Sequence, residues 1–538
     1  MASVANINEV LAGHVAMELS CVDRLYLNAY VPNLQVGGQV VKFLVSHRGN
    51  PVPSPALFEQ NGNRFRKAVK DFAAQWDIPI LRLGKPDRSR FDDRKLDHVR
   101  PYLDAAEREG RFGVVAIVAA QEVQWVFGAK KRPTDSKAVL YDFVKEERRI
   151  GVWYFYLLDA DFGPAFIKIC SYFPYPAKVW CNGHEWAKRQ ATKSGIGFSA
   201  LANGFASCDD VAGLQEICDR FGPGDVQRLF DYWSGVIPSP FTASDKAAGY
   251  WWELSMRQVE VSKTLVFEQP RWARGFFEAL VADNVGIGRP EVVAMIFSRQ
   301  LRSTTKEPFV GRIFTPGSEV HIDFTYKHSR VKQYLKQGRA LRTETVINKP
   351  WDLNIRSRIE HLPELIDKAR QVNERLLMIE RAGQGCAIGS ALFERIHQPY
   401  IREGQRTGAF RFGDPRAMAL AGALSLMVHA VTGFTNSSLR GQVAGLLGRD
   451  YSANQMSYDL RRLRLHGLIE RLPGTNTYVT TPDGIRVAVF FTKLHRRLLY
   501  PLLAADRPPA SADLRSALAT IESEIKGYVT QARLGKAA

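Results

Sequence analysis

Cysteine is scarce in this chain: six occur among 538 residues, and they are thinly scattered. This distribution argues against a disulfide framework and indicates reduced, mostly buried thiols. A structural zinc site is not indicated either, because no second Cys or His pair accompanies Cys181 and His184 at zinc-site spacing. The sequence also has no Gly-Lys-Ser/Thr phosphate loop and therefore gives no sign of ATP use.

Targeting and membrane-spanning signals are also missing. Residues 1–19 have no basic start, and polar residues interrupt their apolar positions, so we expect no signal peptide. The most apolar stretch, residues 417–434, contains Ser425, His429 and Thr432, which favours a buried helix over a membrane span. We therefore expect a cytoplasmic protein without a membrane partner.

Basic residues, in contrast, are abundant. The sequence has 73 Lys and Arg against 55 Asp and Glu, a formal net charge of +18, and no low-complexity tract. An excess of this size favours a polyanionic partner, because phosphates that are neutralised by the protein release their counterions. The alternative is an ordinary enzyme with a basic surface. A chain of this length should contain about three to four domains.

The stretch 435–484 predicts a complete winged helix-turn-helix. A short helix over residues 438–447 and a turn precede a second helix, over about residues 453–466. Two short β runs then flank the turn Pro473-Gly474-Thr475-Asn476, which indicates a hairpin.

The second of these helices has two faces. Met456, Leu460 and Leu463 recur at helical spacing and predict a buried side. The opposite side has the amide and guanidinium groups that reading base edges in a major groove requires. Its predicted nucleic-acid-binding residues are Asn454, Gln455, Tyr458, Arg461 and Arg462. The alternative is a winged helix that contacts only protein.

The remainder of the chain predicts a multidomain α/β protein. Strong β runs followed by a helix indicate a mixed sheet, for which RNase-H-like and replication-initiator-like folds are the two alternatives. We predict seven segments: an N-terminal α/β region (1–110), a mixed-sheet core (111–208), a helical region (209–300), a β region (301–350), a long helix and linker (351–410), the winged helix-turn-helix (411–500) and a C-terminal helix (501–538).

Carboxylates at the ends of predicted strands form a first candidate site. Asp159 and Asp161 follow one strand, Glu122 ends another, Glu185 opens a helix, and Asp23 begins an early strand. Metal-dependent strand cleavage needs converging carboxylates that hold two Mg2+ or Mn2+ ions about 4 Å apart. We predict that Asp159, Glu122 and Glu185 are catalytic, and that Asp159, Asp161 and Glu185 bind metal. The alternative is that these residues form turns and helix caps.

A second candidate lies between residues 326 and 344, where two β runs flank a basic connection. If the runs pair, Tyr326, Tyr334, Arg342 and Glu344 come close together. A tyrosine that attacks a phosphodiester needs cationic neighbours and a carboxylate-bound metal. The alternative is a strand pair with a solvated basic face.

This second stretch resembles the Tyr-x-x-Ser-Arg, Tyr-Asp-Lys and Leu-Arg-x-Glu elements of rolling-circle replication initiators of plasmids and phages. Those proteins are nickases that form a phosphotyrosine link. The resemblance implies that Tyr326 is the nucleophile and Glu344 a catalytic metal ligand. The chain departs from the pattern at Tyr334-Leu335-Lys336, which lacks the acid of Tyr-Asp-Lys.

The chain as a whole looks like a large uncharacterised family of bacterial proteins. The residues that carry this resemblance are Cys170-Ser171-Tyr172-Phe173-Pro174-Tyr175, Asn182-Gly183-His184-Glu185-Trp186 and Arg189-Gln190. The resemblance implies a bacterial origin and carriage on a mobile genetic element.

Three functions follow from these observations. The first is a DNA endonuclease or nickase that depends on Mg2+ or Mn2+ and uses the winged helix as its DNA reader. The second is a non-catalytic DNA-binding regulator. The third is an RNA-binding or RNA-guided protein, so DNA is the expected partner and RNA the alternative. Further phosphate contacts are expected from Arg330, Lys332, Lys130 and Lys131.

Overall fold

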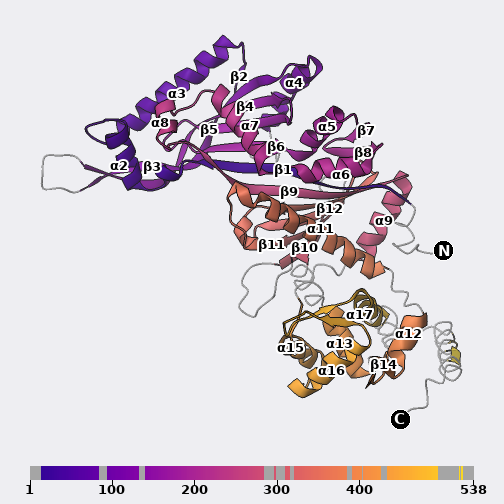
Figure 1. The fold of residues 1–538 in the computed structure, drawn as a ribbon. Helices are drawn as coiled ribbons and strands as arrows, with labels where there is room; N and C mark the ends of the chain where they lie inside the picture. Colours follow the sequence, from indigo (N-terminus) through magenta and orange to yellow (C-terminus); the bar gives the residue numbers. More distant parts are fainter. Residues whose placement is uncertain are drawn as a thin grey trace. The chain divides into compact units, whose positions relative to one another are not determined.

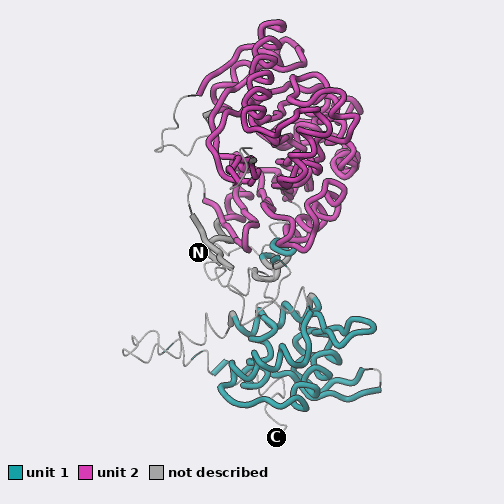
Figure 2. The backbone as a smooth tube through the Cα atoms, turned by 90° about the vertical axis from the view of Figure 1, so that its left-hand side faces the viewer, with its two compact units in different colours: residues 1–8, 283–306, 375–538 teal, residues 9–282, 307–374 magenta. Residues whose placement is uncertain are grey.

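A computed structural model describes most of the chain as two compact units (Figure 2). The described residues are 14–83, 94–132, 140–283, 296–297, 309–314, 320–384, 390–402, 404–425, 433–494, 516, 520 and 523–524. We call residues 9–282 and 307–374 the sheet unit. Residues 1–8, 283–306 and 375–538 form the C-terminal unit. Most of the helix predicted over residues 501–538 lies outside the described residues.

One eleven-stranded sheet organises the sheet unit (Figure 1). Its β2 and β3 are parallel, and all its other neighbours are antiparallel, so the predicted mixed α/β class is confirmed. Across the sheet the order is β10 (Phe309–Phe314), β11 (His321–Tyr326), β12 (Ser329–Lys336), β13 (Ala340–Ile347), β9 (Glu253–Phe267), β1 (Val15–Tyr30), β6 (Ala177–Asn182), β5 (Gly163–Cys170), β4 (Leu140–Asp159), β3 (Gly113–Arg132) and β2 (Ile80–Arg82).

Four of the predicted segments supply strands to this one sheet. β1 comes from the first segment, β6 from the second, β9 from the third and β13 from the fourth, and these strands are neighbours. The boundaries predicted at residues 110, 208 and 300 therefore do not separate independent domains. The backbone ladders that cross them hold these segments in one folded unit.

The central strand β9 is an exception within residues 209–300, which were predicted to be mainly helical. Helices α6 (Val211–Arg220), α7 (Pro223–Val236) and α8 (Ala243–Ala247) do fill the first part. Beyond them, β9 pairs with β1 on one side and β13 on the other, and its polar residues from Glu260 to Thr264 are buried. The alternation of Val259 and Val261 with polar residues was the available sequence signal.

The sheet has an apolar and a polar face. In β1, Leu25 and Leu27 are buried, whereas Arg24 and Tyr26, which alternate with them, keep some exposure. Directly paired residues share a face, and the pairs Tyr26–Trp180, Tyr26–Gln258 and Glu344–Ser262 extend this second face across neighbouring strands. We call it the polar face and identify it by Tyr26, Trp180, Glu260, Arg342 and Glu344.

Helices cover both sides of the sheet. Helix α11 (Leu362–Gln384) lies on the side opposite the polar face, where Asn373 donates to the Val261 carbonyl and accepts from Thr345. On the polar face, His184 at the start of α5 contacts Arg342. The remaining elements of this unit are α2 (Gly37–Lys42), α3 (Pro55–Gln75), α4 (Arg94–Arg108), α5 (Gly183–Lys193), β7 (Phe198–Leu201), β8 (Gly204–Cys208) and α9 (Pro270–Asp283).

The C-terminal unit contains two successive helices and a β hairpin where the sequence predicts them. Helix α15 (Asn436–Leu447) ends at Gly448 in a left-handed conformation, and Ser452 caps α16 (Ala453–Leu465). Strands β16 (Ile469–Arg471) and β17 (Tyr478–Thr480) pair next. The other elements are α12 (Ser390–His397), β14 (Tyr400–Arg402), β15 (Gln405–Thr407), α13 (Pro415–Ser425) and α17 (Pro482–Leu494).

The apolar stretch 417–434 contributes to the core of this unit. Its described first part forms most of α13, whose Leu420 and Leu424 are buried in the same core as Leu439 and Leu460. Among the residues that the structure describes, no helix has the length and apolarity needed to cross a bilayer.

Candidate functional site

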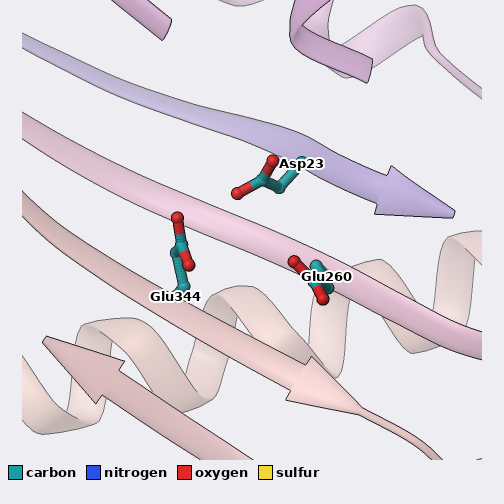
Figure 3. Close-up of side chains that lie close together, drawn as sticks. All are labelled: Asp23, Glu260 and Glu344. Atoms are coloured by element: carbon teal, nitrogen blue, oxygen red, sulfur yellow. The ribbon is translucent and has the colours of Figure 1, made fainter. Parts of the chain in front are cut away.

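Three carboxylates from three neighbouring strands meet on the polar face (Figure 3). Asp23 lies in β1, Glu260 in β9 and Glu344 in β13, and one oxygen from each lies within 4.8 Å of the other two. Their exposed fractions are 0, 5 and 2%. We call these residues the acidic cluster. Within the described part of the chain, they form the one group of His, Cys, Asp or Glu residues arranged to hold a metal ion.

A β-bulge positions Asp23. Val22 pairs with Val261 and Arg24 pairs with Glu260, so Asp23 has no partner of its own in the ladder with β9. An extra residue of this kind bends the strand and redirects the side chains around it. Asp23 thereby joins the face that carries Glu260.

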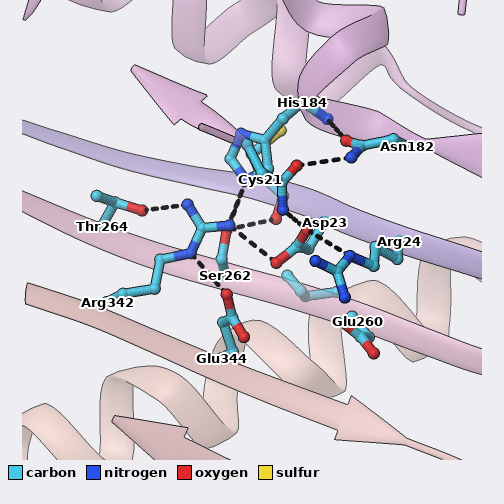
Figure 4. Close-up of polar contacts among 12 residues, drawn as sticks. Cys21, Asp23, Arg24, Asn182, His184, Glu260, Ser262, Thr264, Arg342 and Glu344 are labelled. Atoms are coloured by element: carbon cyan, nitrogen blue, oxygen red, sulfur yellow. Dashed lines mark hydrogen bonds and ion pairs between the residues drawn. The ribbon is translucent and has the colours of Figure 1, made fainter. Parts of the chain in front are cut away.

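Arg342 is fully buried and joins two of the carboxylates (Figure 4). Its Nη2 lies 2.8 Å from Asp23 Oδ2, and its Nε lies 3.0 Å from Glu344 Oε1. Its Nη1 donates to Thr264 Oγ1 at 3.1 Å. Burial disfavours the charged guanidinium, but Asp23 and Glu344 outweigh this cost and raise the pKa of Arg342.

Asp23 is held in its ionised form. Burial alone would raise the pKa of its carboxyl, but the Arg342 guanidinium and further hydrogen bonds hold that pKa well below its usual range. One of these bonds comes from Asn203, which in turn accepts from Asn182 at 2.6 Å. Asn182 also caps α5 by accepting from the backbone N–H groups of His184 and Glu185. The start of α5 is therefore tied to the acidic cluster.

His184 positions Arg342. Its Nε2 lies 2.8 Å from Arg342 Nη2 and 3.0 Å from Ser262 Oγ. Burial lowers the pKa of His184, which favours the neutral imidazole. A neutral ring with its proton on Nδ1 can accept the Arg342 hydrogen bond at Nε2.

Glu260 has an unsatisfied oxygen. Its Oε1 accepts from Gln258 at 2.5 Å, whereas its buried Oε2 has no hydrogen-bond partner among the described residues. Burial and the negative charge of Asp23 raise the pKa of Glu260. A buried carboxylate in this condition is stabilised by a proton or by a cation.

Cationic side chains surround the same carboxylates. Lys332 Nζ lies 2.5 Å from Glu344 Oε2, and the Tyr334 hydroxyl donates to Glu344 Oε1 at 2.8 Å. Arg24, whose side chain is 48% exposed, lies 3.8 Å from Asp23. Burial and the positive charge of Arg342 lower the pKa of Lys336 to about 8. Oxygen ligands suit Mg2+ or Mn2+, but a bound ion would compete with Arg342 and Lys332 for them.

The predicted convergence of Asp159, Glu122 and Glu185 does not occur. Glu122 accepts from the Tyr154 hydroxyl, so it lies on the same face of the sheet as Tyr154. Asp159 follows Tyr154 in β4 at an odd spacing, and side chains at odd spacing in a strand point to opposite faces. Glu122 and Asp159 therefore lie on opposite faces. Both Glu122 oxygens are occupied: Lys95 lies 2.7 Å from Oε1, and Lys168 lies 2.7 Å from Oε2. Glu122 therefore belongs to a salt-bridge network.

The three predicted metal ligands have local structural roles. Asp159 accepts from the backbone N–H groups of Asp161 and Phe162 and from Trp233 Nε1. Asp161 pairs with Lys193, and Glu185 pairs with Lys188 at 2.7 Å. Asp159 and Asp161 line an open cavity of about 630 Å3. Their turn and pairing roles match the structural alternative.

The tyrosine site assembles only in part. Tyr334, Arg342 and Glu344 converge as predicted. Tyr326 pairs with Ser329, whereas Tyr334 pairs with His321, which separates the two tyrosines by about 17 Å along the strands. Tyr326 is also buried. The predicted nucleophile and the predicted metal ligand are therefore not neighbours.

Helix α16 exposes most of its predicted reading residues. Asn454, Tyr458 and Arg461 are exposed, and Gln455 is exposed while its Oε1 accepts from the Ser452 backbone N–H. Arg462 does not fit the prediction of an exposed nucleic-acid-binding residue, because it is buried. Its guanidinium donates to the Ala409 carbonyl and lies 5.2 Å from the Phe410 ring centre.

The remaining predicted phosphate contacts are accessible to different degrees. Lys130 and Lys131 lie at the distal end of the β3–β4 hairpin, where Lys131 is exposed and Lys130 is also accessible. The Arg330 side chain is 43% exposed, whereas that of Lys332 is largely enclosed beside Glu344.

The sequence prediction missed Glu260, and it named Asp23 among the candidate carboxylates without assigning it a catalytic or metal-binding role. The available signal was a charged residue between two valines in the run Val259-Glu260-Val261. A charge at such a position is rarely buried unless it is paired.

Comparison of the chain with protein-family models, with curated proteins and with solved structures finds no match. The function is therefore inferred from the geometry of these residues.

Proposed function

We propose that the protein binds nucleic acid, and in particular duplex DNA, through α16 and the β16–β17 hairpin. The observation that carries this proposal is the division of α16 into two faces. Met456, Leu460 and Leu463 are buried in the core of the C-terminal unit. The opposite face exposes Asn454, Tyr458, Arg461 and Arg464. In a winged helix-turn-helix, a helix with such a face enters the major groove.

The surroundings of α16 support the same proposal. Arg416 lies 5.5 Å from the Tyr458 ring centre and pairs with Asp459 at 2.7 Å, which supports the exposed tyrosine from behind. The hairpin contains Arg471, whose Nη2 donates to Asn476 at 2.7 Å. An ordered hairpin that exposes Arg471 next to the helix is suited to contact the adjacent phosphate backbone.

The test is the salt dependence of DNA binding by the full chain. Fluorescence anisotropy with labelled duplex DNA should show weaker binding by Arg461→Ala and Arg464→Ala. Each variant should also reduce the slope of log affinity against log salt by about one for each phosphate that the helix no longer neutralises. Arg228→Ala removes an exposed charge from the sheet unit and should leave the slope unchanged. Unchanged slopes for the α16 variants would mean that this helix faces protein, and a preference for RNA duplex would favour an RNA partner.

A second function, metal-dependent cleavage of phosphodiesters, is favoured by the unpaired buried oxygen of Glu260. Asp23, Glu260 and Glu344 would hold the ion, which when bound would polarise a phosphate and activate water. The exposed Arg24 would bind the phosphate, and Arg342 would keep two carboxylates in place. The tyrosine-nickase version is not part of this proposal, because Tyr326 is buried away from Glu344.

Metal binding and cleavage can be tested together on the full chain. Isothermal titration with Mn2+ should detect a site that Glu260→Gln removes and that Glu122→Gln, in the saturated salt-bridge network, retains. Single-stranded, duplex and hairpin DNA and RNA should then be cut in Mn2+ but not in EDTA, and Glu260→Gln should not cut them. Binding of nucleic acid without cleavage on every substrate would refute this second function and leave the first intact.

A further inference from the structure

Three aromatic side chains lie side by side on the polar face. Tyr26 in β1 pairs with Trp180 in β6, which pairs with Phe166 in β5. The Phe166 and Trp180 rings stack with their centres 5.7 Å apart, and Tyr26 meets Phe166 edge-on at 6.0 Å. All three side chains are partly exposed, while the residues that alternate with them are buried. We call these three residues the aromatic platform.

Positive charge surrounds the platform. Lys178 Nζ lies 5.2 Å from the Tyr26 ring centre, and the Arg257 guanidinium lies 5.9 Å from it. In the described part of the chain, neither Lys178 nor Arg257 has a carboxylate within ion-pair distance. Burial, together with the charges of Lys168 and Arg257, lowers the pKa of Lys178 to about 7. The platform therefore has cations that no carboxylate of the described chain neutralises directly.

This combination matches the chemistry of a single strand. Unpaired bases stack on aromatic side chains, and their phosphates pair with nearby cations, whereas the bases of a duplex are already stacked on one another. We infer that the aromatic platform binds single-stranded nucleic acid, with bases on Tyr26 and Trp180 and phosphates on Lys178 and Arg257. This surface is additional to the duplex-binding face proposed for α16.

The platform also adjoins the acidic cluster. Tyr26 lies two residues beyond Arg24 in β1, and Arg24 pairs with Glu260 across the ladder. A strand that is stacked on Tyr26 can therefore place a phosphate at the exposed Arg24 guanidinium, beside Asp23. The inference about binding does not depend on cleavage there.

Binding of a labelled oligothymidylate to the full chain tests the inference. Tyr26→Leu and Trp180→Leu keep apolar bulk but remove the aromatic face, and each should weaken single-strand binding about tenfold. Tyr26→Phe should retain binding, because the ring remains. Bound oligothymidylate should also quench tryptophan fluorescence less in Trp180→Leu than in the unmodified protein.

A pair of matched charge variants separates the platform from the general basic charge. Lys178→Gln with Arg257→Gln should weaken binding far more than Lys67→Gln with Lys70→Gln, two exposed lysines of α3. Equal effects of the two pairs, or unchanged affinity in both leucine variants, would overturn the inference. Arg461→Ala should reduce only duplex binding, so the α16 proposal and the platform can fail separately. The inference would also be overturned if the platform bound an acidic peptide more tightly than oligothymidylate.

Discussion

Two ionic clusters, one around Glu122 and the acidic cluster, lie on the polar face of one sheet. They differ in the ratio of hydrogen-bond donors to carboxylate acceptors. Around Glu122, two lysines and Tyr154 donate hydrogen bonds to a single carboxylate, and both of its oxygens accept one. In the acidic cluster, Asp23 and Glu344 share Arg342, Lys332 pairs with Glu344, and one Glu260 oxygen is left without a hydrogen bond from the described residues.

The pKa shifts follow this difference. Burial alone would raise the pKa of Glu122, but Lys168 and the other donors lower it to about 2. Burial and Asp23 instead raise the pKa of Glu260. The carboxylate of the first cluster has all its oxygens hydrogen-bonded without a ligand. The second cluster has a buried carboxylate oxygen that a cation could contact. Carboxylates on a sheet are therefore informative about metal binding only after their hydrogen-bond donors have been counted.

The largest effect is expected from Arg342→Met. This change leaves Asp23 and Glu344 buried without their shared partner, which should cost about 3–5 kcal/mol in the free energy of unfolding. Urea denaturation followed by circular dichroism measures it. Arg330→Met, at a side chain that is 43% exposed, should cost no more than about 1 kcal/mol.

A smaller loss is expected from Lys168→Met. Glu122 keeps Lys95 and Tyr154 as donors, so the same denaturation experiment should give a loss of about 1–3 kcal/mol. A loss as large as that of Arg342→Met would contradict the view that the Glu122 network is the better compensated of the two.

Glu260→Gln should change how stability depends on pH. Because the folded protein raises the pKa of Glu260 above its ordinary value of 4.5, the carboxyl favours folding below that pH, and this contribution is lost as the pH rises through the folded pKa. The glutamine variant lacks the loss, so its stability relative to the unmodified protein should increase from acidic to neutral pH. If the two proteins lose stability equally as the pH rises in metal-free buffer, then folding does not raise the pKa of Glu260.

The smallest effect concerns Lys178→Arg. Lys178 has a pKa near 7 and faces Lys168, Arg257, Lys95, Glu122 and Tyr26. Its positive charge is lost as the pH rises through 7, so binding of oligothymidylate should weaken over this interval. Arginine stays charged, and the variant should bind with little dependence on pH. Equal pH dependence in both proteins would place the phosphate contact elsewhere.

Local patterns were sufficient for several parts of the fold. The turn at Pro473 to Asn476 predicted the β16–β17 hairpin, which forms. Helical spacing of Met456, Leu460 and Leu463 predicted α16, which Ser452 caps in the structure. These features depend on residues within a few positions of one another, and the sequence contains that information directly.

The tertiary structure alone decided which charges meet. Asp23, Glu260 and Glu344 lie in strands that are far apart in the chain, and a bulge in β1 turns Asp23 onto their face. Likewise, Arg462 has the spacing of an exposed residue but is covered by the segment at Ala409 and Phe410. Periodicity determines which side of an element a residue occupies, whereas strand order and packing between distant segments determine whether that side meets solvent, a partner charge or another part of the chain.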